Sequence, residues 1–378
     1  MKNTAKALTA AVLTAVLACS AAGCSTTSTS WSFKTKDATI TNGEWIFATY
    51  SKYNEALGEI QEQNTADAES SESSTPEVNV NTAEIDGKKA IDWIYDEAKK
   101  FCVRQLLLEK LVKENGVEID EDELASTQNI YISYYYSGGK DFYEKLGVGE
   151  QSFADYVARP DYLSDKLFLN LYSEGGAFAV SDEELFKYFT DNYTDYFYIS
   201  CPLTTMDDET EATVAISDEK KETIETNLNK YRVMLNNENA TRSDVTAAYQ
   251  EDFGTETDPT VHATTILEDS TLSEELKVAV GELEEGKAVV KEIGDNLYLI
   301  YRGVIADQTE NIKPQNDIDP TDSDALARES LLHKMRDEEY KTYLEEQEAK
   351  LTYDENAACL SKYSVQRTID IIKADSSN

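Results

Sequence analysis

The stretch SDEELFKYFTDNYTDYFYI, residues 181–199, decides how the chain is organised, because a helical pattern ends within it and a strand pattern begins. Ser181, followed three residues later by Glu184, forms a capping box, which marks the start of a helix. Residues 196–199 are three aromatic residues and one β-branched residue in a row, a composition typical of a strand. We therefore expect a helical part before residue 196 and a part containing strands after it.

The part after residue 196 combines helices with strands. Two runs, 288–293 and 297–302, are predicted to be strands joined by the turn residues between them. Three helical patterns precede these strands, and the strongest repeats apolar residues at helical spacing, at Ile224, Leu228, Tyr231 and Leu235. The order β-α-α-α-β-β over residues 196–306 predicts a compact α/β domain.

The part before residue 196 is mostly helical. Residues 39–41 are expected to form a short strand, and helical patterns follow as far as residue 195. Residues 62–89 interrupt them with an acidic, polar stretch, which we interpret as a disordered insertion. Residues 39–195 are therefore predicted to be the N-terminal part of a helical domain.

The C-terminal part returns to a helical pattern. Residues 307–323 contain two prolines among polar residues and are predicted to be a linker. Residues 324–378 contain a long helix and a tail, which cannot be stable alone because isolated helices are marginal without tertiary packing. We expect this segment to dock on the N-terminal helices. The predicted fold class is α+β multidomain, with an α/β domain inserted into a mostly helical domain.

The N-terminus is typical of a bacterial lipoprotein signal peptide. Lys2 and Lys6 precede an uncharged apolar stretch, residues 7–22, and small residues stand directly before Cys24. Cleavage after residue 23 would leave Cys24 as a lipid-modified N-terminus, and each acyl chain contributes ~0.8 kcal/mol per buried CH₂ to anchoring. Residues 24–38 would then be a polar tether. We predict an extracytoplasmic protein fixed to the cell membrane through this lipid.

Two alternatives to cleavage at this position remain open. Cys19 offers a competing site, but bulky Leu17 stands where a small residue is preferred. The apolar stretch could also stay as an uncleaved membrane helix, although spanning a bilayer needs roughly 20 apolar residues.

Composition excludes several classes of function. The formal net charge of −38 repels phosphate backbones and anionic headgroups, so we predict neither nucleic-acid binding nor direct adsorption to a membrane. Beyond the signal, Cys102, Cys201 and Cys359 are odd in number and far apart, which argues against a disulfide framework and favours core thiols.

Few residue patterns in the chain carry chemistry. The two histidines, His262 and His333, lie in different segments, which gives little support for a histidine metal site or a catalytic triad. Acidic residues from Asp317 onward hint at a calcium loop, but its twelfth position is Arg328 and the central glycine is missing. We therefore predict no catalytic residue, no metal site and no cofactor.

Tyrosine is the more informative excess, with 23 residues against 11 phenylalanines. Tyrosine combines a large apolar face with a polar tip, which suits contact with varied partners. The densest group precedes a pair of glycines and consists of Tyr131, Tyr134, Tyr135 and Tyr136. These residues either contribute to a groove for unfolded polypeptide or form a half-buried helix face whose hydroxyls reach water.

The order of segments resembles the PrsA/SurA family of extracytoplasmic foldases. The resemblance covers nearly all of the chain after the signal, and it is carried by the stretches TITNGE (39–44), KENGVEID (113–120), VSDEEL (180–185), and LKVAV…LEEGK (276–287). It implies a chaperone domain resembling the SurA N-terminal domain, with an inserted parvulin-type peptidyl-prolyl isomerase domain at 196–306.

The chain departs from this family at the isomerase site. Active parvulins carry one histidine in the first strand and one in the last, and these places fall at Tyr198 and Tyr298. The glycine-rich stretch of the family is replaced near residues 260–264. The resemblance therefore implies a degenerate proline pocket at the two tyrosines, with weak or lost isomerase activity.

Three functions follow as hypotheses. The first is a lipid-anchored chaperone or foldase whose partners are unfolded or partly folded exported polypeptides, with a second copy of the chain as a further candidate partner. The second is an active peptidyl-prolyl isomerase. The third is a structural or adaptor lipoprotein with a dedicated partner.

Overall fold

The computed structural model describes residues 30–67, 79–206, 211–236 and 240–376, so the predicted signal peptide and Cys24 lie outside the described residues. The chain divides into two compact units. We call residues 1–178 with 338–378 the helical unit, and residues 179–337 the α/β unit. Among the described residues, no helix is long and apolar enough to span a membrane.

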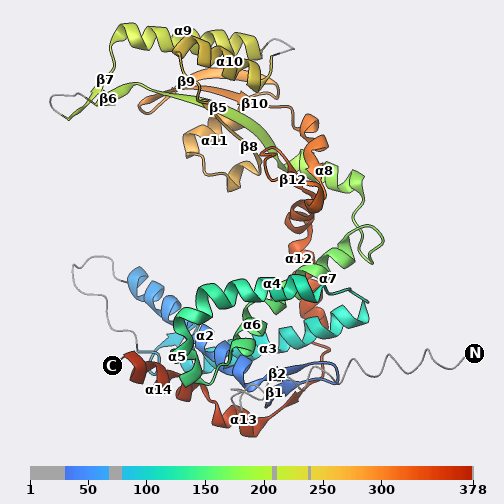
Figure 1. Cartoon of the computed structure of the whole chain (residues 1–378). Helices are drawn as coiled ribbons and strands as arrows, with labels where there is room; N and C mark the ends of the chain where they lie inside the picture. Colours follow the sequence, from blue (N-terminus) through green and yellow to red (C-terminus); the bar gives the residue numbers. More distant parts are fainter. Residues whose placement is uncertain (1–29, 68–78, 207–210, 237–239, 377–378) are drawn as a thin grey trace, which may run out of the picture. The chain divides into compact units, whose positions relative to one another are not determined.

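The helical unit is built from segments at both ends of the chain (Figure 1). Its elements are β1 (Trp31–Lys34), β2 (Thr39–Thr41), α2 (Asn42–Asp67), β3 (Glu84–Ile85), β4 (Lys88–Lys89), α3 (Ala90–Glu114), α4 (Glu121–Tyr131), the π-helical turn η1 (Ile132–Tyr136), α5 (Ser137–Leu146), α6 (Glu150–Val157), α7 (Arg159–Tyr172), the later part of α12 (Arg328–Glu348), β13 (Asp354–Glu355), α13 (Ala357–Lys362) and α14 (Val365–Ser376).

The two ends of the chain meet in one small sheet and one core. Strand β1 pairs with β2 on one side and with β13, from the C-terminal segment, on the other. Trp45 on α2 is completely buried, and Thr49 one turn later lies 3.1 Å, oxygen to oxygen, from Thr368 on α14. The C-terminal segment therefore packs on α2.

The start of α2 explains its position beside this sheet. Thr41 Oγ1 accepts the backbone N–H of Glu44, and Glu44 Oε2 accepts the backbone N–H of Thr41, which together form a capping box. Burial raises the pKa of Glu44 to about 7, and the nearby carboxylate of Asp155 acts in the same direction. The helix thus begins directly at the end of β2, with its capping glutamate buried in the core.

Two segments predicted to be irregular are partly ordered. The predicted tether, 24–38, contains β1, because Phe33 is fully buried and the strand gains hydrogen bonds from both neighbours. In the predicted disordered insertion, 62–89, α2 continues to Asp67 and residues 84–89 form the β3–β4 hairpin. Val80 and Ile85 are buried against α2 and α3 and hold this return segment in place. Residues 68–78 lie outside the described residues.

The α/β unit contains a four-stranded antiparallel sheet. Its elements are α8 (Asp182–Asn192), β5 (Thr194–Pro202), β6 (Thr204–Met206), β7 (Thr213–Ala215), α9 (Asp218–Leu235), α10 (Arg242–Phe253), β8 (Thr260–Thr265), the 3₁₀ turn η2 (Leu267–Asp269), α11 (Glu274–Gly281), β9 (Lys287–Ile293), β10 (Asn296–Arg302), η3 (Ile305–Asn311), β11 (Ile312–Lys313), η4 (Gln315–Asp317), β12 (Leu326–Ala327) and the first part of α12.

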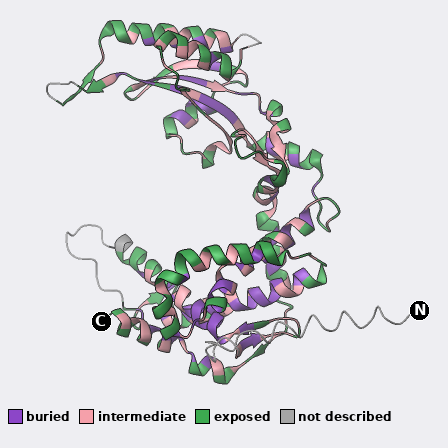
Figure 2. Cartoon of the chain, in the orientation of Figure 1, coloured by how far each residue is buried: buried purple, intermediate pink, exposed green. Residues whose placement is uncertain are grey.

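The sheet has the order β8-β5-β10-β9, and helices cover both faces (Figure 1). Strand side chains alternate between faces, so Phe197 and Ile199 of β5 pack with α9 and α10, whereas Tyr196 packs with α11. Residues of both β5 and β10 are accordingly buried, with Ser200 and Pro202 of β5 exposed (Figure 2). Both faces of the sheet thus contribute a core.

The borders of the α/β unit differ from those predicted. Helix α8 and the first part of α12 belong to this unit, and not to the helical one. The predicted linker, 307–323, is folded: β11 pairs in parallel with β12, and Ile305 just before it is buried. Polar side chains stabilise this order: Lys313 donates to Asp322 at 2.9 Å, and Asp324, just after the segment, binds Arg242 and His262.

Candidate functional site

The predicted tyrosine group lies at the junction of α4 and η1 in the helical unit. Tyr134 and Tyr135 are 78% and 62% exposed, and Ile130 one turn earlier is 55% exposed. Tyr131 is half-buried, with its ring centroid 6.0 Å from that of Tyr135. We call Ile130, Tyr134 and Tyr135 the η1 patch, a surface where apolar faces and hydroxyls both meet solvent.

Tyr136 does not belong to this surface, contrary to the prediction. It is only 2% exposed, and its ring stacks on Tyr143 with centroids 5.5 Å apart. Burial raises the pKa of its hydroxyl. Successive side chains point in different directions around a helical turn, so a run of three tyrosines must send at least one toward the core.

The second predicted pair, Tyr198 and Tyr298, lies on the neighbouring strands β5 and β10. Their ring centroids are 5.8 Å apart in an edge-to-face arrangement. Both are partly buried against the cluster under α11, and burial raises the pKa of Tyr198, with the neighbouring Tyr298 as a smaller cause. The Tyr198 hydroxyl is therefore a proton donor for hydrogen bonds, not a base at neutral pH.

A pocket lies beside Tyr298 on the same face of the sheet. Lys291 of β9 is the register partner of Tyr298, and directly opposed residues share a face. The pocket has a volume of about 430 Å³ and is lined by Glu274, Glu275, Val278, Lys291, Glu292, Ile293 and Gly294. We call it the α11 pocket. Its lining offers an apolar floor, Val278 and Ile293, with charged groups around it, which suits binding of a side chain.

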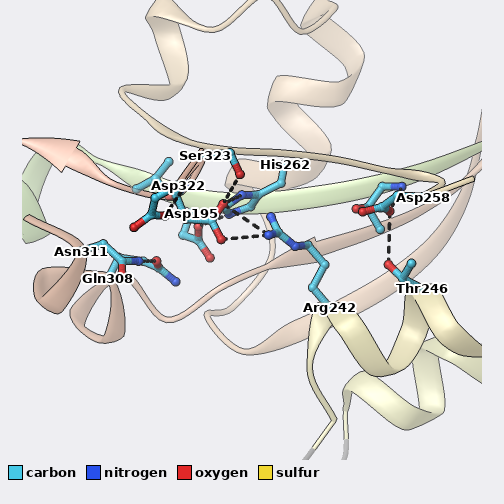
Figure 3. A network of polar contacts seen from close by, with 12 residues as sticks. Asp195, Arg242, Thr246, Asp258, His262, Gln308, Asn311, Asp322 and Ser323 are labelled. Carbon is cyan, nitrogen blue, oxygen red and sulfur yellow. Dashed lines mark hydrogen bonds and ion pairs between the residues drawn. The ribbon is translucent and has the colours of Figure 1, made fainter. Parts of the chain in front are cut away.

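The opposite face of the sheet holds a polar network that sequence reasoning missed (Figure 3). His262 on β8 has Nε2 2.8 Å from Asp195 Oδ1 and Nδ1 3.1 Å from Asp324 Oδ1. Arg242, at the start of α10, also binds Asp324, at 2.9 Å. Both ring nitrogens therefore face carboxylates. The imidazole links β8 to β5 and to the segment that precedes β12, and Arg242 links that segment to α10.

The fold brings Asp195 close to the backbone at this point. Asp195 is 6% exposed and also accepts a hydrogen bond from Thr264. A Cβ on Gly303 would lie 1.8 Å from Asp195 Oδ2, so only glycine leaves room for this carboxylate. A cavity of about 280 Å³ lies at the network. Because every ring nitrogen of His262 is engaged, the network holds the sheet and the segment together and offers no free base.

Metal chemistry has no obvious place in the part of the chain that the structure describes, where no group of three or more histidine, cysteine, aspartate or glutamate side chains is arranged to hold an ion. Cys102 and Cys201 are buried free thiols, and burial raises the pKa of each. Cys359 is partly buried, and its sulfur accepts a hydrogen bond from Asn42. The thiols of Cys102 and Cys201 are therefore poor nucleophiles at neutral pH.

Comparison with known proteins gives one kind of similarity. No protein-family model and no curated protein matches the chain. Among solved structures, foldase protein PrsA from Lactococcus lactis is 11% identical, with a TM-score of 0.32, over 89% of this chain and 99% of that chain. Foldase protein PrsA from Streptococcus pneumoniae is 12% identical, with a TM-score of 0.28, over 89% of this chain and 99% of that chain.

A third similar structure is the peptidylprolyl isomerase PrsA from Bacillus anthracis, 12% identical with a TM-score of 0.23, over 66% of this chain and 94% of that chain. At these identities and TM-scores the function has to be argued from the residues of this chain. The chain is thus similar to PrsA foldases along most of its length. This similarity does not establish that the chain belongs to their family.

Proposed function

We propose that this protein is an extracytoplasmic chaperone of the foldase type, anchored through a lipid on Cys24, that holds unfolded exported polypeptides. The observation that carries the proposal is the η1 patch, where Tyr134 and Tyr135 stand 78% and 62% exposed next to exposed Ile130. Large exposed apolar side chains on a folded unit are a common mark of an interaction surface.

The chemistry of the patch suits many clients better than one. Tyrosine offers a rigid apolar face for any hydrophobic segment and a hydroxyl for any backbone carbonyl, at a low cost in side-chain entropy. The ring of Tyr131 lies next to that of Tyr135, so the exposed Tyr135 packs beside a half-buried aromatic ring. The strongly negative chain also keeps bound complexes apart by repulsion.

A second candidate function is prolyl isomerisation. The α11 pocket beside Tyr298 favours this function, as does the Tyr198 ring, whose centroid lies 5.8 Å from that of Tyr298. Such an enzyme must bind a twisted prolyl bond better than a planar one to lower a barrier of ~18–20 kcal/mol. A protease-coupled assay on a proline tetrapeptide tests this function, and rates equal to the uncatalysed rate reject it.

The chaperone proposal is tested by changing the patch without changing the fold. The double variant Tyr134→Ser/Tyr135→Ser should weaken binding of a reduced, unfolded client about tenfold in fluorescence anisotropy, since about 1.4 kcal/mol corresponds to tenfold. Val233→Ser is the control, because Val233 is 52% exposed on α9 of the other unit. Equal client affinities for the wild type and the double variant would remove the η1 patch from the proposal.

A further inference from the structure

The outer edge of the β-sheet in the α/β unit is only half covered. Strand β9 is at the end of the order β8-β5-β10-β9. It pairs with β10 across a two-residue turn, with Ile293 opposite Asn296. In such a hairpin the residues alternate between those bonded to the partner strand and those whose N–H and C=O face outward. Counting back from the turn, Ala288, Val290 and Glu292 face outward.

One of these three positions is occupied by a side chain. Asn236, which ends α9, accepts the N–H of Ala288 at 2.9 Å and donates to its carbonyl oxygen at 3.3 Å. This contact confirms that even-numbered positions of β9 face the open edge. Within the described ranges, no hydrogen bond from outside the β9–β10 pair reaches the backbone of Val290 or Glu292. The edge is therefore capped at one end and open at the other.

The α11 pocket lies next to the open end. Lys291, Glu292 and Ile293 form one wall, and Glu274, Glu275 and Val278 of α11 form the other. Val278 is 53% exposed, which is unusual for a valine in a helix over a sheet. The charged groups of the lining are three glutamates and one lysine, Lys291, which lies on the strand wall, whereas Glu275 lies on the helix wall.

The ion pairs around the pocket leave one carboxylate available. Lys277 pairs with Glu274 at 3.2 Å, and Lys221 on α9 pairs with Glu292 at 2.8 Å. Glu275 is exposed and takes part in no ion pair among the residues that the structure describes. A ligand side chain with an apolar stem and a positive end would fit this pocket. Its stem would contact Val278 and Ile293, and its charge would lie near Glu275.

We propose that an extended client segment adds to the sheet as a fifth strand on β9 and places a lysine or arginine side chain in the α11 pocket. The client backbone pairs with the outward N–H and C=O groups of Val290 and Glu292, as in other cases of strand addition. The basic side chain lies along Val278 and Ile293 and sets its charge against Glu275. The inference rests on the proposed function, because it names the class of polypeptide segment that the chaperone holds.

The test uses the full chain from Cys24 onward, with serine at that position, and two peptides. Both alternate valine and threonine over eight residues, one with a central lysine and one with a central glutamate. The lysine peptide should bind about fivefold more tightly than the glutamate peptide, because the glutamate peptide replaces one attractive exposed charge pair with a repulsive one. Binding should also slow amide exchange at Val290 and Glu292.

Two variants separate the contributions of backbone and charge. Val290→Pro removes an outward N–H that β10 does not use, so it should abolish binding of both peptides and leave the exchange of buried Leu299 unchanged. Glu275→Lys should remove the preference for lysine, whereas Glu282→Lys, the same change on an exposed residue just beyond α11, should keep it. Equal binding of the two peptides by the wild type, or wild-type binding by Glu275→Lys, overturns the inference.

The outcomes distinguish this inference from the proposed function. If the chain prevents client aggregation but neither peptide protects Val290 and Glu292, the strand-addition site is wrong and the chaperone function stands. If the peptides bind at β9 but clients aggregate as they do alone, the chaperone function is wrong and the strand-addition site stands.

Discussion

The indole Nε1 of Trp45 donates a hydrogen bond of 2.8 Å to the backbone carbonyl oxygen of Tyr363, across 318 residues of sequence. Trp45 is completely buried, and its ring packs edge to face on Phe33 and Tyr95. Helix α2 and the C-terminal segment thus share one core, with the α/β unit inserted between them in sequence.

Replacing Trp45 with phenylalanine should destabilise the helical unit by about 2–3 kcal/mol, because a buried carbonyl loses its donor and part of the indole volume becomes a cavity. The same change at Trp93, which is only partly buried, should cost less than half as much. Urea unfolding followed by circular dichroism measures both. Equal losses would mean that the contact between the chain ends contributes little to stability.

Glu44 should make stability fall as pH rises toward neutrality. Its pKa in the folded protein is about 7, above the ordinary value of 4.5, because burial disfavours the charge. A carboxyl whose pKa is raised on folding contributes stability that is fully present below about pH 4.5 and is lost as pH rises through about 7. The full effect is roughly 3 kcal/mol, taken from the size of this shift.

The variant Glu44→Gln should remove this dependence, because glutamine keeps the cap on Thr41 without a charge. It should match the wild type near pH 5 and exceed it in stability at pH 8. Glu59→Gln, on the exposed face of the same helix, is the control and should follow the wild type. Parallel stability curves for the wild type and Glu44→Gln between pH 5 and 8 would contradict the assignment.

His262→Ala should destabilise the α/β unit by about 3 kcal/mol, since Asp195 and Asp324 then face one another without the ring between them. The segment from residue 303 to 327 should exchange its amides faster and be cut sooner by protease. His333→Ala removes a half-buried histidine that lies 2.8 Å from the exposed Asp337, and it should cost less than 1 kcal/mol. Similar effects of the two variants would rule out a special role for His262.

Cys24→Ser should move the protein from the membrane fraction to the medium or the soluble fraction, because lipidation needs the thiol. Cys19→Ser leaves the predicted acceptor intact and should stay in the membrane fraction. Fractionation followed by detergent phase partitioning compares the two. Release by Cys19→Ser, with retention of Cys24→Ser, would place the lipid on the competing cysteine.

Local patterns predicted the elements of this fold well. The capping box of Ser181 starts α8, the strand at 39–41 is β2, and the strands at 288–293 and 297–302 agree with β9 and β10 to within one residue. In each of these cases the signal lies within a few residues of the element, in a cap, an alternation of side chains or a tight turn.

The misses depend on contacts between distant residues. Strand β1 was hidden in the predicted tether because one of its two partners, β13, lies more than 300 residues away, although the other, β2, is close in sequence. The site of His262 was set aside because its partners Asp195, Arg242 and Asp324 come from three other elements or segments. Tyr136 was grouped with exposed tyrosines because spacing alone does not tell which side of a π-helical turn faces the core.

The central claim is that the protein holds unfolded polypeptides, and its most direct test is the light scattering of a chemically unfolded client diluted into buffer. At an equimolar ratio, the chain from Cys24 onward, with serine at that position, should slow aggregation several-fold, and Tyr134→Ser/Tyr135→Ser should lose most of this effect. Aggregation of the client at the same rate with and without the equimolar protein would contradict the account.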